Sequence, residues 1–463
     1  MASTEEDLAL VKAFLRRTRT AVSDGDVAAG TGLDIGSTKA ALYTLMRSHR
    51  CRLQVREDGT MIYDFGDELV SLERKSWRER LAGVGRWLWK GFTVAYKASL
   101  AVVLVTYAVV FVALILAAAV VVSVAAEDEA PAEGVFHLVA AIFQAIFEFA
   151  TYTPVVYADT DRFGYAHANY EPKKPVLFKR RKPHEKGFVA SVYDFVFGPK
   201  RVEPGPMAQR KELAAFVRTN RGVLTVRDVQ ALSGLSRPDA EALFARFVAE
   251  QEGEAQITEE GVLYATFEEL LRSKSTEHDA AIEFYWDEYE APFEFTGNSV
   301  SKNAVIAGLG AFNLAGAFTV MNLVPQLGDV GLWLGAVPAV LFSLFFAMPM
   351  LRAPWVWWKN RKQHAHNMRK RLFRAIFGAK EAGLSKAEIV ERANEHATTE
   401  ERLRVEDIDG LLEQTIDEVG AEKRVNEVGE VVADFPRIRV EEQVVEEHAL
   451  ELEPLDQEVV FET

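Results

Sequence analysis

The sequence predicts an α-helical membrane protein whose soluble α+β domains alternate with two transmembrane helical hairpins. Three observations predict this fold class: two long apolar blocks, basic residues that flank the blocks, and a soluble segment that occurs more than once. The chain has 463 residues, of which 49% are hydrophobic and 26% charged, so its overall composition is globular rather than disordered.

The first apolar block, residues 98–157, is predicted to form a hairpin. No charged residue occurs from Ala98 to Ala126, a stretch longer than the roughly 20 residues that cross a bilayer. The second half, Gly134 to Tyr157, is less apolar, and the alternative is that it lies in the membrane interface. Lys and Arg flank the block on both sides and are absent between its halves, which places both flanks on the cytoplasmic side.

The second block, residues 303–351, reads as another hairpin made of Ala304 to Val324 and Gly331 to Met350. The segment after it is strongly basic, and its tryptophans belong at the headgroup level. The small residues Ala307, Ala311 and Ala315 predict a closely packed helix face.

Residues 11–65 match residues 213–267 without a gap, which indicates two copies of one domain. Identical pairs include Phe14 with Phe216, and the pattern of each copy is helix, short helix, glycine turn, helix and two strands. This is the order of a winged helix, and each copy resembles that superfamily. A third copy is predicted from Met368, with a longer turn near Glu395 to Leu403.

These features divide the chain into ten segments. They are winged-helix-like domain 1 (1–70), a basic juxtamembrane helix (71–97), hairpin 1 (98–157), a basic linker (158–206), winged-helix-like domain 2 (207–272), an acidic linker (273–302), hairpin 2 (303–351), a basic juxtamembrane segment (352–367), winged-helix-like domain 3 (368–438) and an acidic tail (439–463). The tail is predicted to be flexible, or to be a partner-binding segment.

A winged helix suggests DNA binding, which requires a basic third helix. Only the first copy is mildly suitable, through Lys39, Arg47 and Arg50. The corresponding regions of the other copies are acidic, which favours protein contacts over nucleic acid. The run from Gly32 to Lys39 resembles the phosphate-binding turn of sugar kinases, but no strand precedes it, so we interpret it as a turn within the repeated domain.

A polar stripe, spaced to share one helix face, lies in the second half of hairpin 1: His137, Gln144, Glu148 and Thr151. Its functional interpretation is a water-filled path or proton relay, and the alternative is hydrogen bonding to neighbouring spans. His364 and His366 have no third metal ligand nearby. We therefore expect no catalytic residue, no cofactor site and no metal site, and the chain is not expected to be an enzyme.

The single cysteine, Cys51, excludes an intrachain disulfide and fits a reducing compartment. The segment from Met1 to Asp7 has no signal-peptide pattern. The expected location is the cytoplasmic (inner) membrane, with several spans and with the soluble domains and both termini in the cytoplasm.

The run from Ser191 to Lys200, followed by the segment Gly222 to Thr225, is similar to an uncharacterised family of bacterial and plastid multi-span membrane proteins. That resemblance implies membrane residence. The leading hypothesis is a membrane scaffold or regulatory protein that contacts anionic headgroups and binds protein partners or copies of itself. The alternatives are a membrane-tethered DNA-binding regulator and a small transporter or channel component.

Overall fold

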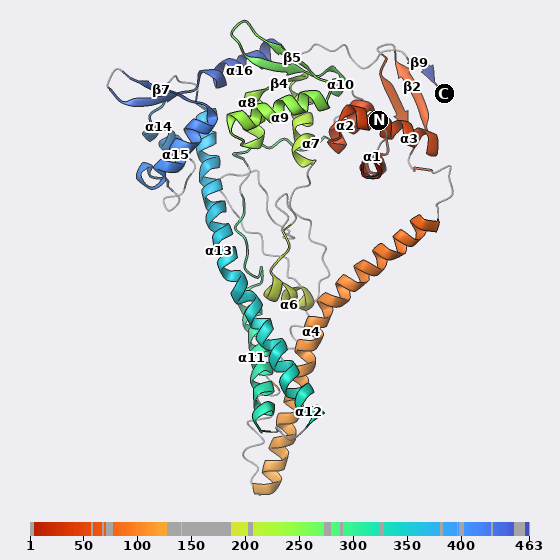
Figure 1. The fold of residues 1–463 in the computed structure, drawn as a ribbon, viewed down its shortest axis with the longest axis vertical. Helices are drawn as coiled ribbons and strands as arrows, with labels where there is room; N and C mark the ends of the chain where they lie inside the picture. The colour runs from red at the N-terminus through yellow and green to blue at the C-terminus, as the bar shows by residue number, and fades with distance from the viewer. Residues whose placement is uncertain are drawn as a thin grey trace.

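A head made of three small α+β units stands on a stalk of long helices (Figure 1). The structure, a computed structural model, describes residues 4–56, 59–66, 69–70, 77–126, 140, 187–201, 207–272, 279–287, 290–323, 328–379, 383–395, 397, 402–426, 429–448 and 459–462. Three helices in these ranges are long and apolar enough to cross a membrane: Gly91–Val122, Val300–Asn322 and Asp329–Phe377. The prediction of an α-helical membrane protein with α+β parts is confirmed at this level.

The stalk consists of α4 (Trp77–Ala126), α11 (Val300–Leu323), α13 (Val337–Phe377) and the short α6 (Phe188–Phe197). The chain passes from α11 to α13 through α12 (Asp329–Gly331) and the π-helical turn η1 (Leu332–Ala336), and α11 and α13 pack along each other. Helix α6 packs on α4, α11 and α13, where its Val192 and Val196 are buried.

The buried face of α11 is not the face that the small residues Ala307, Ala311 and Ala315 predicted. Ala311 and Ala315 are exposed, whereas Asn313 and Ala317 are fully buried. Asn313 Nδ2 donates to the carbonyl oxygen of Leu104 in α4 at 2.8 Å. A polar side chain in an apolar bundle is stabilised by such a bond, so Asn313 sets the packed face.

The three units share the order of three helices followed by a β-hairpin. Unit 1 contains α1 (Glu5–Thr18), β1 (Val22–Ser23), α2 (Asp24–Thr31), α3 (Ile35–Ser48), β2 (Arg52–Arg56) and β3 (Met61–Asp64). Unit 2 contains α7 (Ala208–Thr219), β4 (Val223–Thr225), α8 (Val226–Ser233), α9 (Arg237–Glu250), β5 (Glu254–Ile257), β6 (Leu263–Thr266) and α10 (Glu268–Leu271). Unit 3 contains the end of α13, then α14 (Lys386–Ala393), α15 (Val405–Val419), β7 (Glu422–Val425), β8 (Val431–Asp434) and α16 (Pro436–Glu447).

Strand register is also the same in the three units. The strand before the second helix pairs through Val22 with Tyr63 in unit 1 and through Leu224 with Ala265 in unit 2, and a single bridge joins Leu384 to Ala433 in unit 3. The hairpin turns before these partner strands contain Gly59, Gly261 and Gly429, whose φ angles are 81°, 80° and 84°. Such angles favour glycine, so the turn chemistry fixes the register of each hairpin.

The second helix of every unit begins with the same capping box. Ser23, Thr225 and Ser385 cap the backbone N–H of Asp26, Asp228 and Glu388, and each carboxylate accepts from the cap residue's own N–H. This reciprocal pair satisfies two helix N–H groups that otherwise lack partners. It fixes the direction in which the second helix leaves the preceding strand.

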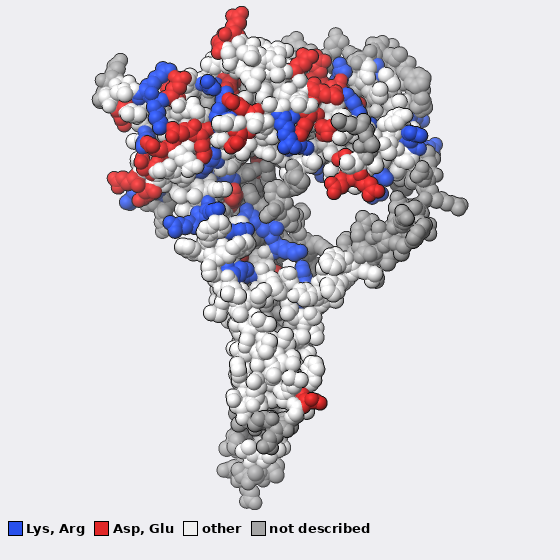
Figure 2. All heavy atoms as spheres, in the orientation of Figure 1, with Lys and Arg blue, Asp and Glu red and all other residues white. Residues whose placement is uncertain are grey.

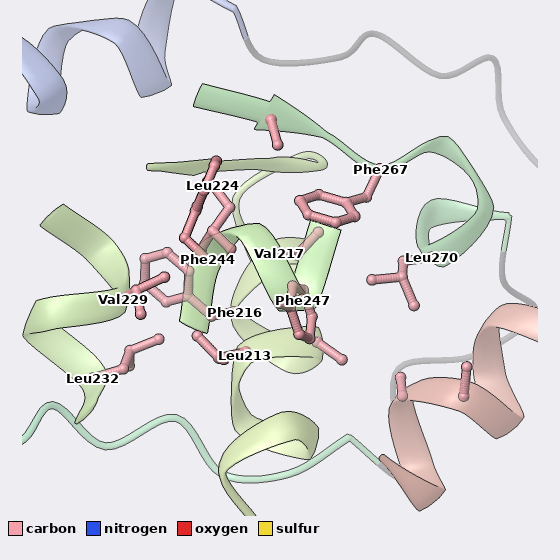
Figure 3. Packing of buried hydrophobic residues seen from close by; sticks show 14 of the residues in the cluster. Leu213, Phe216, Val217, Leu224, Val229, Leu232, Phe244, Phe247, Phe267 and Leu270 are labelled. Atoms are coloured by element: carbon pink, nitrogen blue, oxygen red, sulfur yellow. The ribbon is translucent and has the colours of Figure 1, made fainter. Parts of the chain in front are cut away.

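The hydrophobic core of unit 2 includes residues of unit 1. Leu213, Phe216, Phe244 and Phe267 face one another (Figure 3), and Ala28, Ala29 and Ile35 of unit 1 are fully buried in the same cluster. In the same way, Ala231 of α8 is buried in the core of unit 3 among Leu372 and Phe373. The three units therefore form one continuous body.

The acidic tail differs from the flexible segment that its composition predicts. Val444 of α16 is buried against Val223, Val262 and Tyr264 of unit 2. Further along, β9 (Val459–Glu462) adds to the edge of the unit 1 sheet, antiparallel to β2, and gives the strand order β1-β3-β2-β9. Within residues 436–448 and 459–462, the tail connects unit 3 to unit 2 through the packing of α16 and to unit 1 through the strand pairing of β9.

Candidate interaction surfaces of the head and stalk

The contact between units 1 and 2 is centred on the buried Arg218 of α7. Its Nη2 donates to Asp26 Oδ1 of α2 at 2.8 Å, and its Nη1 donates to Asp279 Oδ1 at 2.6 Å. The Arg218 side chain is only 2% exposed. A buried guanidinium needs such charged partners, so unit 1, unit 2 and the following linker are held together at one point.

Around Arg218 the contact is polar and tight. Gln251 Nε2 donates to the carbonyl oxygen of Leu33 at 3.0 Å. A Cβ added at Gly25 would lie 2.4 Å from the carbonyl oxygen of Glu269 in α10, so only glycine allows this approach. Asp24, the next residue back, is buried beside Lys39, Glu252 and Glu269, and burial raises its pKa to about 6.

The contact between units 2 and 3 is centred on Glu441 of α16. This carboxylate is 3% exposed and accepts from the Arg237 guanidinium at 2.5 Å and from the backbone N–H of Arg227 at 2.6 Å. Tyr285, in the linker before α11, donates its N–H to the carbonyl oxygen of Ala231 at 2.8 Å. Burial also raises the pKa of Asp228, to about 6, although Arg227 and Thr225 favour its charged form.

Both contacts use equivalent surfaces. We define the rear face of a unit as its second helix with the turn that follows, and the front face as its first helix, the end of its third helix and the helix after its hairpin. The rear face of unit 1 (α2) contacts α7 and α10 of unit 2, and the rear face of unit 2 (α8) contacts α16 of unit 3. Equivalent alanines, Ala29 and Ala231, are buried at the two contacts. The three units thus form a row in which each contact is of the head-to-tail type.

Of the three residues proposed for nucleic-acid contact, Lys39 pairs with acids of unit 2, whereas Arg47 and Arg50 are exposed. Lys39 Nζ lies 3.1 Å from Glu252 and 3.9 Å from Glu269, both of unit 2. Arg47 stacks over Tyr43 on the exposed side of α3, and the Arg50 backbone N–H donates to the carbonyl oxygen of Val70. Lys39 therefore contributes to the contact between units.

The polar stripe of His137, Gln144, Glu148 and Thr151 lies outside the described residues, so its role stays a prediction. Among the described residues, no group of three or more His, Cys, Asp or Glu side chains is arranged to hold a metal ion. His366 faces Glu290 at 3.9 Å instead. Burial would raise the pKa of Glu290, but hydrogen bonds from His366 and Lys370 outweigh it and hold that pKa at about 2.

A basic and aromatic collar separates the apolar stalk from the head. In Figure 2 the stalk surface is mostly uncharged, and Lys and Arg gather where it meets the head. On α13, Lys359 and Lys362 lie over the rings of Trp355 and Trp358 at 3.9 and 4.0 Å. Alternation of this kind is typical of a helix at the level of lipid headgroups.

Arg352 ties three segments together just below this collar. Its guanidinium donates to the carbonyl oxygen of Val196 at the end of α6 at 3.2 Å, donates to the carbonyl oxygen of Phe295, and lies over the Phe295 ring. Nearby, Asn298 Nδ2 donates to the carbonyl oxygen of Ser191. These carbonyl groups stabilise a guanidinium charge that is partly removed from water.

The sequence could have pointed to only part of this geometry. The spacing Ser23–Asp26, Thr225–Asp228 and Ser385–Glu388 is a readable capping signal. Arg218 was visible only as an identity with Arg16, and Glu441 only as one acid among many in the tail. Their partners come from other units, which sequence spacing does not reveal.

Comparison with known proteins yields one distant relative. An uncharacterised chloroplastic protein of Arabidopsis thaliana is 26% identical over 223 residues. The match covers 42% of each chain, so this sequence corresponds to less than half of that relative's length. No family model matches the chain, and no solved structure matches it.

Replacing Arg218 should destabilise the head. Arg218→Ala leaves Asp26 and Asp279 buried without their cation, which we expect to lower the free energy of unfolding by about 3–5 kcal/mol. Thermal unfolding of the purified protein in mild detergent measures the change. The matched control is Arg246→Ala, because Arg246 pairs with Glu250 at a side chain that is 67% exposed and should contribute under about 1 kcal/mol. Equal effects of the two variants would contradict the central role of Arg218.

Asp24 should make stability depend on pH. Because the pKa of Asp24 is raised to about 6 in the folded protein, folding takes up a proton between about pH 4 and 6, and this site lowers stability as pH rises through that window. Asp24→Asn should therefore raise the unfolding temperature at pH 7 and change it little at pH 4. The exposed Asp239→Asn serves as the control. A pH-independent effect of Asp24→Asn would refute the assignment.

Proposed function

We propose that this chain is an integral membrane scaffold or regulatory protein whose three units present a rigid platform on one membrane face to protein partners or to further copies. The main support is the continuous row of units, in which residues of one unit complete the core of the next. A platform held in this way presents its surfaces in a fixed arrangement, as recognition of a specific partner requires.

We further propose that the units are copies of a winged-helix-like domain. The common order of elements, the common register and the three capping boxes support this assignment. The third helix of a DNA-binding winged helix would be basic and accessible, whereas Lys39 of α3 pairs with acids of unit 2, and the first turn of α15 contains Glu406 and Asp407. These observations favour protein contacts.

The proposed topology has all three units on one side, with residues 98–157 and 303–351 each crossing and returning. Helix α4 leaves the head and ends at Ala126, whereas α6 lies beside the start of the apolar region, since Lys97 is over the ring of Tyr193. A chain that leaves at one end of the stalk and reappears at the other must return between these two points. The expected location is a cytoplasmic (inner) membrane, or a plastid membrane by analogy with the chloroplastic relative.

The collar supports a further part of the proposal, that the stalk contacts anionic lipid headgroups. Lys359, Arg361 and Lys362 lie over tryptophan rings of α13, so their charges are held at one level along the stalk. Juxtamembrane basic residues at such a level each contribute about 1 kcal/mol of attraction to an anionic leaflet.

The topology can be tested with reporters that are active on only one side of the membrane. A reporter inserted at residue 130 and one inserted after Lys200 should report opposite sides, because one crossing lies between them. A reporter at the N-terminus should agree with the one after Lys200. Equal signals at residues 130 and 200 would show that residues 134–157 do not cross and would overturn the first hairpin.

The scaffold proposal predicts a stoichiometric complex. Purification of the full chain in mild detergent should yield a protein partner or a homo-oligomer, measured as particle mass and composition. A variant with Arg218→Ala, whose row is loosened, should lose this complex. Recovery of only the bare monomer under several detergents and in nanodiscs would count heavily against a scaffold.

A further inference from the structure

Among the described residues, the contacts between units leave one rear face and one front face unused. Each contact joins the rear face of one unit to the front face of the next. In unit 3 the rear face is α14, which packs on α13 and α15 of its own unit. In unit 1 the front face is α1, which packs on α2 and α3. Because the contact is of the head-to-tail type, nothing in its geometry stops after three units.

The residues on the two unused faces carry opposite charges. On α14, Glu391 occupies the position that Ala29 and Ala231 occupy in the other units, and it is exposed. On α1, Lys12 occupies the position of the buried Ala214, and the exposed Arg16 occupies that of Arg218. Where the internal contacts bury alanine, the unused faces therefore have an acid on one side and a base on the other.

Solubility of the two terminal faces does not by itself require this pattern of charges. A terminal unit of a repeat array needs a polar outer surface, and charges of either sign provide one. Here, however, the charges on the two faces are opposite, as they are across the contact between units 1 and 2. Glu388 of α14 stands where Asp26 stands in α2, and Arg16 stands where Arg218, the partner of Asp26, stands in α7. Asp26 binds Arg218 while it also caps its own helix, so the cap made by Glu388 is compatible with such a pair.

We propose that α14 of one copy binds α1 of a second copy, so that the row of units continues from chain to chain along the membrane. The contact repeats the one between units 1 and 2, with Arg16 toward Glu388 and Lys12 toward Glu391. Both copies stand on the same membrane face, and Figure 1 shows the units side by side across the top of the stalk, so the row extends in the plane of the bilayer. A head-to-tail contact closes into a ring or grows into a filament, according to its angle.

The proposal deepens the scaffold function by naming a second copy as a partner and by naming the contact. It also predicts the character of that contact. Because exposed ion pairs replace the apolar centre, association should be weak and sensitive to salt, unlike the buried contacts within one chain. Tethering to one surface raises the effective concentration and allows a weak contact to assemble copies.

Crosslinking between two different variants tests the contact directly. In a background of Cys51→Ser, which removes the only cysteine, one chain has Lys12→Cys and another has Glu391→Cys, and both are placed in the same nanodiscs or vesicles. A disulfide between them forms only between copies. We expect a crosslinked dimer at low salt and roughly tenfold less at high salt. The matched control pairs Lys12→Cys with Glu254→Cys, an exposed acid on β5. Equal yields from both pairs would overturn the proposal.

Charge reversal provides the second measurement, and it distinguishes loss of the contact from loss of folding. Lys12→Glu alone and Glu391→Lys alone should each weaken self-association roughly tenfold, because like charges then face each other. Combining both changes in one chain should restore association, since opposite charges again meet across copies. Failure of the double variant to recover, with unchanged thermal stability, would refute the contact. A monomeric chain that still binds a different protein would refute this inference and leave the scaffold function standing.

Discussion

Units 2 and 3 depend on a neighbouring unit to complete their cores. Unit 2 buries Ala28, Ala29 and Ile35 of unit 1, and unit 3 buries Ala231 of unit 2. Separating the units would expose these surfaces and would also expose Arg218 and Glu441, whose charges are satisfied across the contacts. Domains joined by small polar interfaces usually move relative to one another, but units that share cores and buried ion pairs do not. The head should behave as one body.

Helix α13 connects this rigid head directly to the membrane stalk. This single helix begins in the stalk, passes Arg352 and the collar, and ends as the first helix of unit 3, where Leu372 and Phe373 are buried. The linker before α11 runs back along it, with Asn360 and Asn367 hydrogen-bonded to the backbone of Phe293 and Glu290. Pro349 and Pro354 lie on either side of Arg352, so the helix lacks two backbone N–H groups near the Arg352 contacts.

Local features of the sequence predicted local structure well. Gly59 and Gly261 marked hairpin turns because few other residues adopt their backbone angles, and uninterrupted apolar runs marked α4 and α11. Contacts between units were not predictable, because Ala29 and Ala231 are ordinary helix residues until a neighbour is placed against them. The prediction of a flexible tail was wrong for a related reason. Its many acids suggested a solvated segment, whereas its spaced valines, such as Val444, pack on unit 2. The packed face of α11 was misplaced because Gly310, Asn313 and Ala317 form it, rather than Ala311 and Ala315.

The position of β9 has a consequence for the order in which the protein is completed. Unit 1 precedes units 2 and 3 in the chain, yet the strand on the outer edge of its sheet consists of Val459–Glu462, which follows both of them. Throughout membrane insertion of the stalk and synthesis of units 2 and 3, the outer edge of β2 therefore lacks this strand. An open edge pairs readily with other extended chains, so the nascent protein passes through a period in which its first unit is exposed to mispairing. Synthesis of β9 ends that period and joins a segment that follows the stalk to one that precedes it in a single sheet.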